Sequence, residues 1–195
     1  MHGLINHSFQ RYMCDSYGQD AWLAVAVRAG VSPPTFEPML TYDDAITPAV
    51  LDAMAAVLHR TRAEVMEDIG AHLVSHPKTE AVGRLLRFGG MNFEDFLHSL
   101  DDLPDRARMA VSELHLPAIE LHGYADGQYS LICDSPVAGF GHLMMGILRV
   151  MADDYGALAL LDLEGDDSGR EVVRIQLIQT DFANGRAFDL GAWAI

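Results

Sequence analysis

The chain has 195 residues, half of them apolar, which suits one domain with a substantial hydrophobic core. Its 28 acidic residues outnumber the 13 lysines and arginines, so the formal net charge is −15 at pH 7. Because an acidic surface repels phosphate backbones, the composition argues against nucleic-acid binding and suits docking on a basic partner.

The N-terminus and the cysteines indicate the compartment. The opening residues MHGLINHSFQRYM lack the basic and apolar regions of a signal peptide. The longest apolar stretch, residues 138–152, carries Arg149 and is too short to span a bilayer. Cys14 and Cys133 form no CxxC motif, which predicts buried free thiols in a reducing compartment. We therefore expect a cytoplasmic protein that does not enter a membrane.

The first part of the chain has the periodicity of helices. Apolar residues at helical spacing predict helices over residues 4–29, with a break near residues 16–18 and a stop at Gly30. A proline-rich loop follows. Thr47 and Pro48 are then expected to be the N-cap and first position of the next helix.

Further helices follow up to a proline that interrupts an amphipathic pattern. Thr61 and Glu64 form a capping box at the start of one helix, which Pro77 ends. Residues 92–103, NFEDFLHSLDDL, predict a short helix that stops at Pro104. Proline suits the first turn of a helix, so PDRARMAV is expected to form the next one.

The second part of the chain changes its period. Two strand-like runs flank Asp126-Gly127, a strong hairpin signal. A long helix is expected to open at Ser135-Pro136 and to close at Gly156.

Two further strands follow the long helix. They cover residues 157–165 and 171–180 and are joined by the acidic turn at 166–169, whereas the tail after them has no clear pattern. The predicted order is therefore helices first, and then β-β-α-β-β.

This order and several strings resemble the heme-nitric-oxide/oxygen-binding (H-NOX, HNOB) domain family, the gas-sensing domains of bacteria and of soluble guanylate cyclase. The matching strings are MHGLINH, SYGQDAW, LTYDD, FGGMNFEDFLHSLDDL and LICDSPVAGFGHLMMGILRVMADDYG, and they cover nearly the whole chain. The resemblance implies a single α+β domain over residues 1–195. In it, a helical N-terminal lobe (1–112) packs on a C-terminal β-β-α-β-β lobe (113–195) with an antiparallel sheet, and heme lies between the lobes.

Both heme-holding motifs of the family depart from the pattern here. The family's proximal histidine, which ligates the iron, falls on Pro104, and proline has no lone pair free for a metal. The Tyr-x-Ser-x-Arg motif, which holds the heme propionates, falls on Cys133, Ser135 and Val137, so that only the serine is retained. Cys133 is more simply a buried thiol than a thiolate ligand, since the family places this position at the heme edge.

Three other positions belong to the pocket that the resemblance implies. His142 falls where some oxygen-binding members carry a distal tyrosine, so it is the candidate iron ligand; the simpler alternative is a half-buried histidine bonded to a carbonyl. Leu4 and Ile5 match apolar residues of the first helix that line the distal pocket. His98 points roughly 120° away from residue 104 on a continuous helix, so we expect it to be solvated or capping.

The resemblance implies a non-catalytic sensory and regulatory domain. It would bind heme, and through the heme nitric oxide or another gas, and would signal to a separate partner protein. No catalytic motif and no fused kinase or cyclase domain is found in these 195 residues, so we expect no enzyme activity. With both motifs altered, heme ligation is expected to be atypical or lost. The alternative is a heme-free scaffold that binds a partner protein or another apolar ligand.

Overall fold

The computed structural model describes residues 1–165 and 170–186. The helices before the sheet are α1 (Gly3–Tyr17), α2 (Gln19–Ala29), α3 (Ile46–Leu58), α4 (Arg62–Ser75), the 3₁₀ turn η1 (Pro77–Thr79), α5 (Glu80–Arg87), α6 (Phe93–His98) and α7 (Leu103–Ala110). The second part consists of β1 (Ala118–Gly123), β2 (Gln128–Asp134), α8 (Phe140–Tyr155), β3 (Leu158–Gly165) and β4 (Glu171–Gln179). The expected acidic turn at 166–169 and the end of the tail lie outside the described residues.

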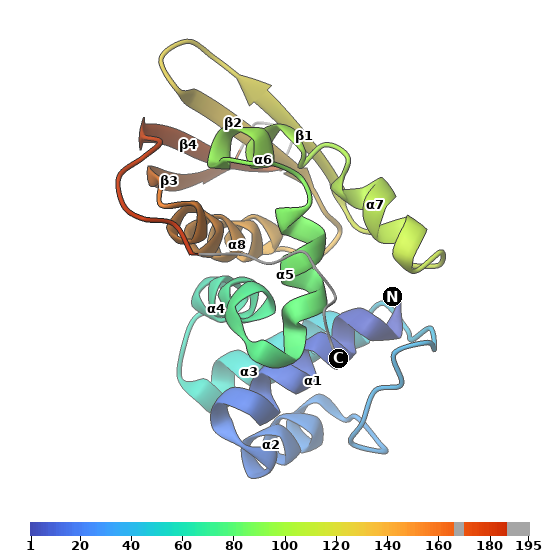
Figure 1. Cartoon of the computed structure of the whole chain (residues 1–195). Helices are drawn as coiled ribbons and strands as arrows, with labels where there is room; N and C mark the ends of the chain where they lie inside the picture. Colours follow the sequence, from blue (N-terminus) through green and yellow to red (C-terminus); the bar gives the residue numbers. More distant parts are fainter. Residues whose placement is uncertain (166–169, 187–195) are drawn as a thin grey trace, which may run out of the picture.

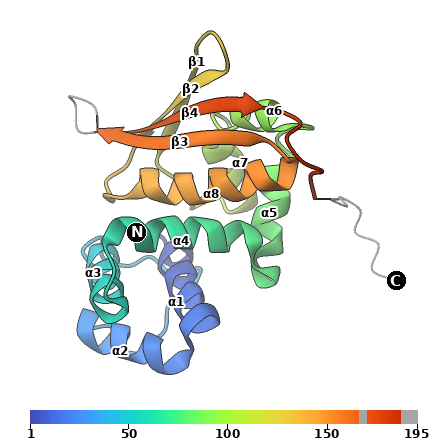
Figure 2. The same ribbon diagram turned by 90° about the vertical axis from the view of Figure 1, so that its left-hand side faces the viewer.

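The predicted α+β fold class is confirmed. The four strands form one antiparallel sheet in the order β1-β2-β4-β3. Figure 2 shows the layers: α8 lies under one face of the sheet, α4 lies under α8, and α1 to α3 lie below α4. Figure 1 shows the same order from the side, with α5, α6 and α7 flanking the stack. Within the described residues, no helix has the length and apolar character needed to cross a membrane.

Local signals placed most boundaries correctly. Asp126 and Gly127 both have positive φ, as a tight hairpin turn requires. The capping box of Thr61 and Glu64 is present at the start of α4. Gly156 ends α8 in the left-handed conformation, as expected.

Two predicted helix starts are wrong. Thr47 does not cap α3; it lies buried inside the helix, where its hydroxyl donates to Asn6 Oδ1 at 2.8 Å. The long helix α8 starts at Phe140, several residues after the expected Ser135-Pro136. The distant Asn6 side chain engages Thr47. The Ser135 hydroxyl instead bonds to Val137 within its own turn, and Glu171 accepts from the N–H groups at the start of α8.

The described residues bury two hydrophobic clusters. The N-terminal cluster gathers side chains of α1 to α4, including Trp22, Met54 and Ile69. The second cluster joins one face of the sheet to α8 and also takes up Phe96 and Leu103. The helices α5, α6 and α7 therefore pack with the sheet lobe, although they precede residue 113 in the chain. The boundary at residue 112 stays a prediction.

The two lobes meet along α4 and α8, whose backbones come into contact at two glycines. A Cβ atom built on Gly70 would lie 2.0 Å from the Leu143 carbonyl oxygen, and one on Gly146 would lie 1.9 Å from the Glu67 carbonyl oxygen. Real Cβ contacts are never this short, so only glycine allows the approach. An ion pair at 2.8 Å between Arg149 and Glu67 lies beside this contact.

We expect Gly146→Ala to lower the free energy of unfolding by about 2 kcal/mol. A clash with backbone costs about 3 kcal/mol or more, and alanine regains only about 1 kcal/mol of helix propensity. Chemical denaturation monitored by circular dichroism measures the difference. Gly165→Ala is the control, because nothing lies within 4 Å of a Cβ there, and it should change stability by less than about 0.5 kcal/mol. Equal losses in both variants would contradict the close-contact interpretation.

Candidate functional site

Pro104 lies half-buried in the first turn of α7, so the prediction that it opens a new short helix is confirmed. The expected helix over residues 92–103 is wrong, because α6 ends at His98 and a turn separates it from α7. Proline is tolerated there because the first N–H groups of a helix have no intrahelical partner. Arg106 stabilises the turn before α7, since its guanidinium donates to the Ser99 carbonyl at 2.8 Å and to the Ser99 hydroxyl at 3.2 Å. His98 is exposed at the end of α6, as expected for a solvated histidine.

Cys133 is buried in β2, with 1% of its surface exposed. Its neighbours across the sheet are Ile119 on β1 and Glu171 on β4. Burial, together with the negative charge of Glu171, raises the pKa of the Cys133 thiol to about 12. The group is therefore a neutral thiol near pH 7, which agrees with the interpretation of a buried structural cysteine.

The segment from Ser135 to Gly139 forms a turn closed by its own hydrogen bonds. The Ser135 hydroxyl accepts from the Val137 N–H at 3.1 Å and donates to the Val137 carbonyl at 3.0 Å. The Val137 side chain packs against the N-terminal cluster. The only retained residue of the propionate motif thus has its hydroxyl engaged within the turn.

A carboxylate from β4 occupies the start of α8. Glu171 accepts hydrogen bonds from the Gly139 N–H at 2.7 Å and from the Gly141 N–H at 2.6 Å. These are donors that the first turn of a helix leaves free, and the positive end of the helix dipole favours a negative charge there. Sequence reasoning missed Glu171 because the residues it caps lie 30 positions or more earlier in the chain, and no local pattern signals such a contact.

His142, Leu4 and Ile5 are all half-buried. His142 lies in the first turn of α8 and has no hydrogen-bond or ion-pair partner within the described part of the chain, so the expected carbonyl partner is not found. Leu4 and Ile5 lie in the first turn of α1, and Ile5 packs against the same N-terminal cluster as Val137. The roles of these residues in binding heme or iron stay predictions.

Two surface depressions are found elsewhere. One is lined by residues 87–91 together with exposed residues of α6 and the turn after it. The other lies on the sheet, between the end of the β1–β2 hairpin and β3 and β4. Neither is lined by any of the residues predicted for the heme site.

The helical lobe, the antiparallel sheet and the long helix between them define the H-NOX fold. The H-NOX protein from K. algicida superposes with a TM-score of 0.77 at 15% identity, covering 94% of this chain and all of that one. An oxygen-binding H-NOX domain related to soluble guanylate cyclases gives a TM-score of 0.71 at 16% identity, covering 96% of this chain and all of that one.

The chain belongs to the Haem-NO-binding (HNOB) family, whose sequence model matches residues 2–159. It is 25% identical to the soluble guanylate cyclase gcy-31 of Caenorhabditis elegans over 187 residues, and 23% identical to soluble guanylate cyclase 89Da of Drosophila melanogaster over 181. These alignments cover 93% and 91% of this chain but 27% of each relative. The resemblance found in the sequence is thereby confirmed.

The family implies a heme, and the residues at the motif positions do not fit one held in the family's way. Pro104 offers no ligand atom, and Val137 offers no cation for a propionate. Cys133 is a buried neutral thiol, and the Ser135 hydroxyl is engaged within its turn. The carboxylate of Glu171 is hydrogen-bonded at the end of the Ser135–Gly139 turn. It would repel the carboxylate of a heme propionate rather than bind it.

The environment of the two cysteines predicts different reactivity. Burial raises the pKa of Cys133 to about 12, so its thiol is almost entirely neutral at pH 8, and its side chain is covered. The prediction that both thiols are buried is wrong for Cys14, which is only partly buried and whose thiol donates to the Gln19 side-chain oxygen at 3.3 Å. We expect iodoacetamide at pH 8 to label Cys14 in the folded protein, and Cys133 only after denaturant is added. Mass spectrometry of Cys14→Ser isolates Cys133, and rapid labelling of that folded variant would contradict the buried placement.

Proposed function

We propose that this chain is a non-catalytic regulatory domain that acts on a separate partner protein and does so without a heme ligated in the family's way. The observation that carries the proposal is the carboxylate of Glu171 at the start of α8. This carboxylate already accepts hydrogen bonds from the free N–H groups at the start of α8, directly after the turn that carries Ser135 and Val137. An external acidic group would have to compete with this internal one.

The electrostatics of the turn support the same proposal. Val137 provides no positive charge, and the Glu171 side chain accepts hydrogen bonds from the N–H groups of Gly139 and Gly141. Two carboxylates at close range disfavour each other's ionised form. A dicarboxylate ligand such as heme would therefore meet repulsion at the position where the family provides an arginine.

A regulatory role requires two conformations that a ligand or partner distinguishes. Helix α8 is suited to couple the lobes, because it lies between the sheet and α4 and carries residues of both hydrophobic clusters. A partner that binds one lobe would bias the other through this helix. The net charge of −15 favours a protein partner with a basic surface over nucleic acid or an anionic membrane.

A second candidate function is a heme sensor that binds iron through His142. The observation that favours it is the half-buried imidazole of His142, which has no partner among the described residues and carries ring nitrogens of the kind that ligate iron. In that case bound heme would supply the diatomic-gas chemistry, and the chain would contribute one axial nitrogen and the apolar side chains of Leu4 and Ile5.

An absorbance spectrum of the chain purified from heme-supplemented cells distinguishes the two candidates. The heme-free proposal predicts a colourless protein and no stoichiometric Soret band after titration with hemin, because ligand and anchors are both missing. A stoichiometric band that shifts with nitric oxide and disappears in His142→Ala, but not in the exposed control His98→Ala, would establish the sensor instead.

Restoring the two lost motif residues tests whether the chain lacks only the heme-holding side chains or also the space for heme. We expect Pro104→His with Val137→Arg to remain unable to take up one heme per chain. The Val137 side chain packs against the N-terminal cluster, and Glu171 still holds the start of α8. Hemin titration followed at the Soret maximum measures uptake. Stoichiometric binding by the double variant, with wild type as the matched control, would show that the space for heme has been kept.

A further inference from the structure

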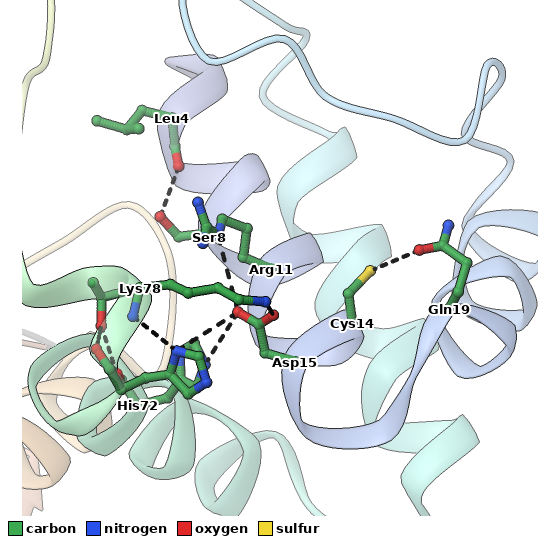
Figure 3. A network of polar contacts seen from close by, with 10 residues as sticks. Leu4, Ser8, Arg11, Cys14, Asp15, Gln19, His72 and Lys78 are labelled. Atoms are coloured by element: carbon green, nitrogen blue, oxygen red, sulfur yellow. Dashed lines mark hydrogen bonds and ion pairs between the residues drawn. The ribbon is translucent and has the colours of Figure 1, made fainter.

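Three metal-binding side chains meet at the far end of α1 and α4. Asp15 Oδ2 lies 3.8 Å from His72 Nε2 and 3.8 Å from His76 Nδ1. One ligand atom from each of the three residues lies within 4.8 Å of the others. Figure 3 shows Asp15 on α1 facing His72 on α4, with the Lys78 side chain also reaching the Asp15 carboxylate.

The fold places these residues by two local rules and one tertiary contact. His72 is in the last turn of α4, and His76 follows four residues later at the helix end, so both rings lie on the same side. The rings stack with centroids 4.6 Å apart. Asp15 is in the last turn of α1, which brings a carboxylate to this pair.

His72 is buried, and its ring makes no hydrogen bond to the described residues. It is 8% exposed, and neither of its ring nitrogens has a hydrogen-bond partner in the described residues. The Asp15 side chain is also 8% exposed, and its Oδ2 atom has none either. Buried nitrogen and oxygen atoms nearly always have a hydrogen-bond partner. The unpaired ring nitrogens of His72 and the unpaired Oδ2 of Asp15 are therefore atoms that a bound cation could use.

Two cations face this carboxylate: Arg11 Nε lies 4.0 Å from Asp15 Oδ2, and Lys78 is the closer counter-charge. Its ammonium nitrogen lies 2.5 Å from Asp15 Oδ1, and its side chain is 61% exposed. A flexible exposed lysine can swing away when a metal takes its place.

We propose that Asp15, His72 and His76 bind a divalent transition-metal ion of the zinc type. Two imidazoles and one carboxylate are a common ligand set for zinc, with a fourth position left to water. Ligand atoms bound tetrahedrally at about 2.0–2.2 Å lie roughly 3.3–3.6 Å apart, so the separations of 3.8 Å between Asp15 Oδ2 and the two histidines would have to shorten by a few tenths of an ångström. Small side-chain rotations would complete the site.

The helix ends add a second reason for a cation. Asp15 and His72 lie in the last turns of α1 and α4, where unpaired carbonyl groups give a negative electrostatic potential. A metal here would join α1 to α4, the helix whose Gly70 contacts α8. The site is distinct from the positions aligned with the family's heme motifs, and it would stabilise the helical lobe.

Equilibrium dialysis of the full chain against zinc chloride, without a polyhistidine tag, tests the proposal. We expect one zinc per chain, with affinity falling at least about tenfold in His76→Ala and in the isosteric Asp15→Asn. The exposed histidine variant His115→Ala serves as the control and should bind as wild type does. Wild type that binds no zinc, or a His76→Ala variant with unchanged affinity, would overturn the proposal.

The variant Lys78→Ala provides a test in which zinc affinity is expected to rise rather than fall. Removing the competing ammonium should make zinc bind several-fold more tightly, a gain that a damaged fold would not produce. Circular dichroism confirms that each variant is folded. Binding to Lys78→Ala that is no tighter than to wild type would overturn the assignment of Lys78 as the group that zinc displaces, and with it this geometry.

Discussion

The arrangement of the whole domain depends on the close approach of α4 and α8. Gly70 and Gly146 let a backbone carbonyl of the opposite helix come nearer than any side chain would allow. Each glycine costs about 1 kcal/mol of helix propensity relative to alanine, so the contact has to repay this through packing. The sheet and α8 bury one cluster above this contact, and α1 to α3 bury another below it.

The fold could be predicted from the sequence where the signals are local. Asp126-Gly127, the Thr61–Glu64 box and Gly156 act through neighbouring residues, and all three predictions are confirmed. The two wrong helix starts were decided by distant contacts. The Asn6 side chain engages Thr47, and the Glu171 carboxylate takes over the start of α8.

In the candidate sites, too, local features could be predicted from the sequence and distant contacts could not. The replacement at Pro104 was visible in the sequence, because it interrupts a helical pattern and a family motif at once. The capping of α8 by Glu171 could not be predicted from the sequence, because it depends on the register of β4 against β2. The four-residue spacing of His72 and His76 can be read from the sequence. The position of Asp15 beside these two histidines follows only from the packing of α1 against α4.

The presence of two clusters has a consequence for how the domain opens. If either cluster loosens alone, α4 and α8 lose one of the two surfaces that cover them but keep each other. Local opening should therefore begin at the outer layers, and the amide protons of these two helices should exchange with solvent last. The helix pair would then be the most slowly exchanging cooperative unit, shared by both lobes, although its members lie more than 60 residues apart in the chain.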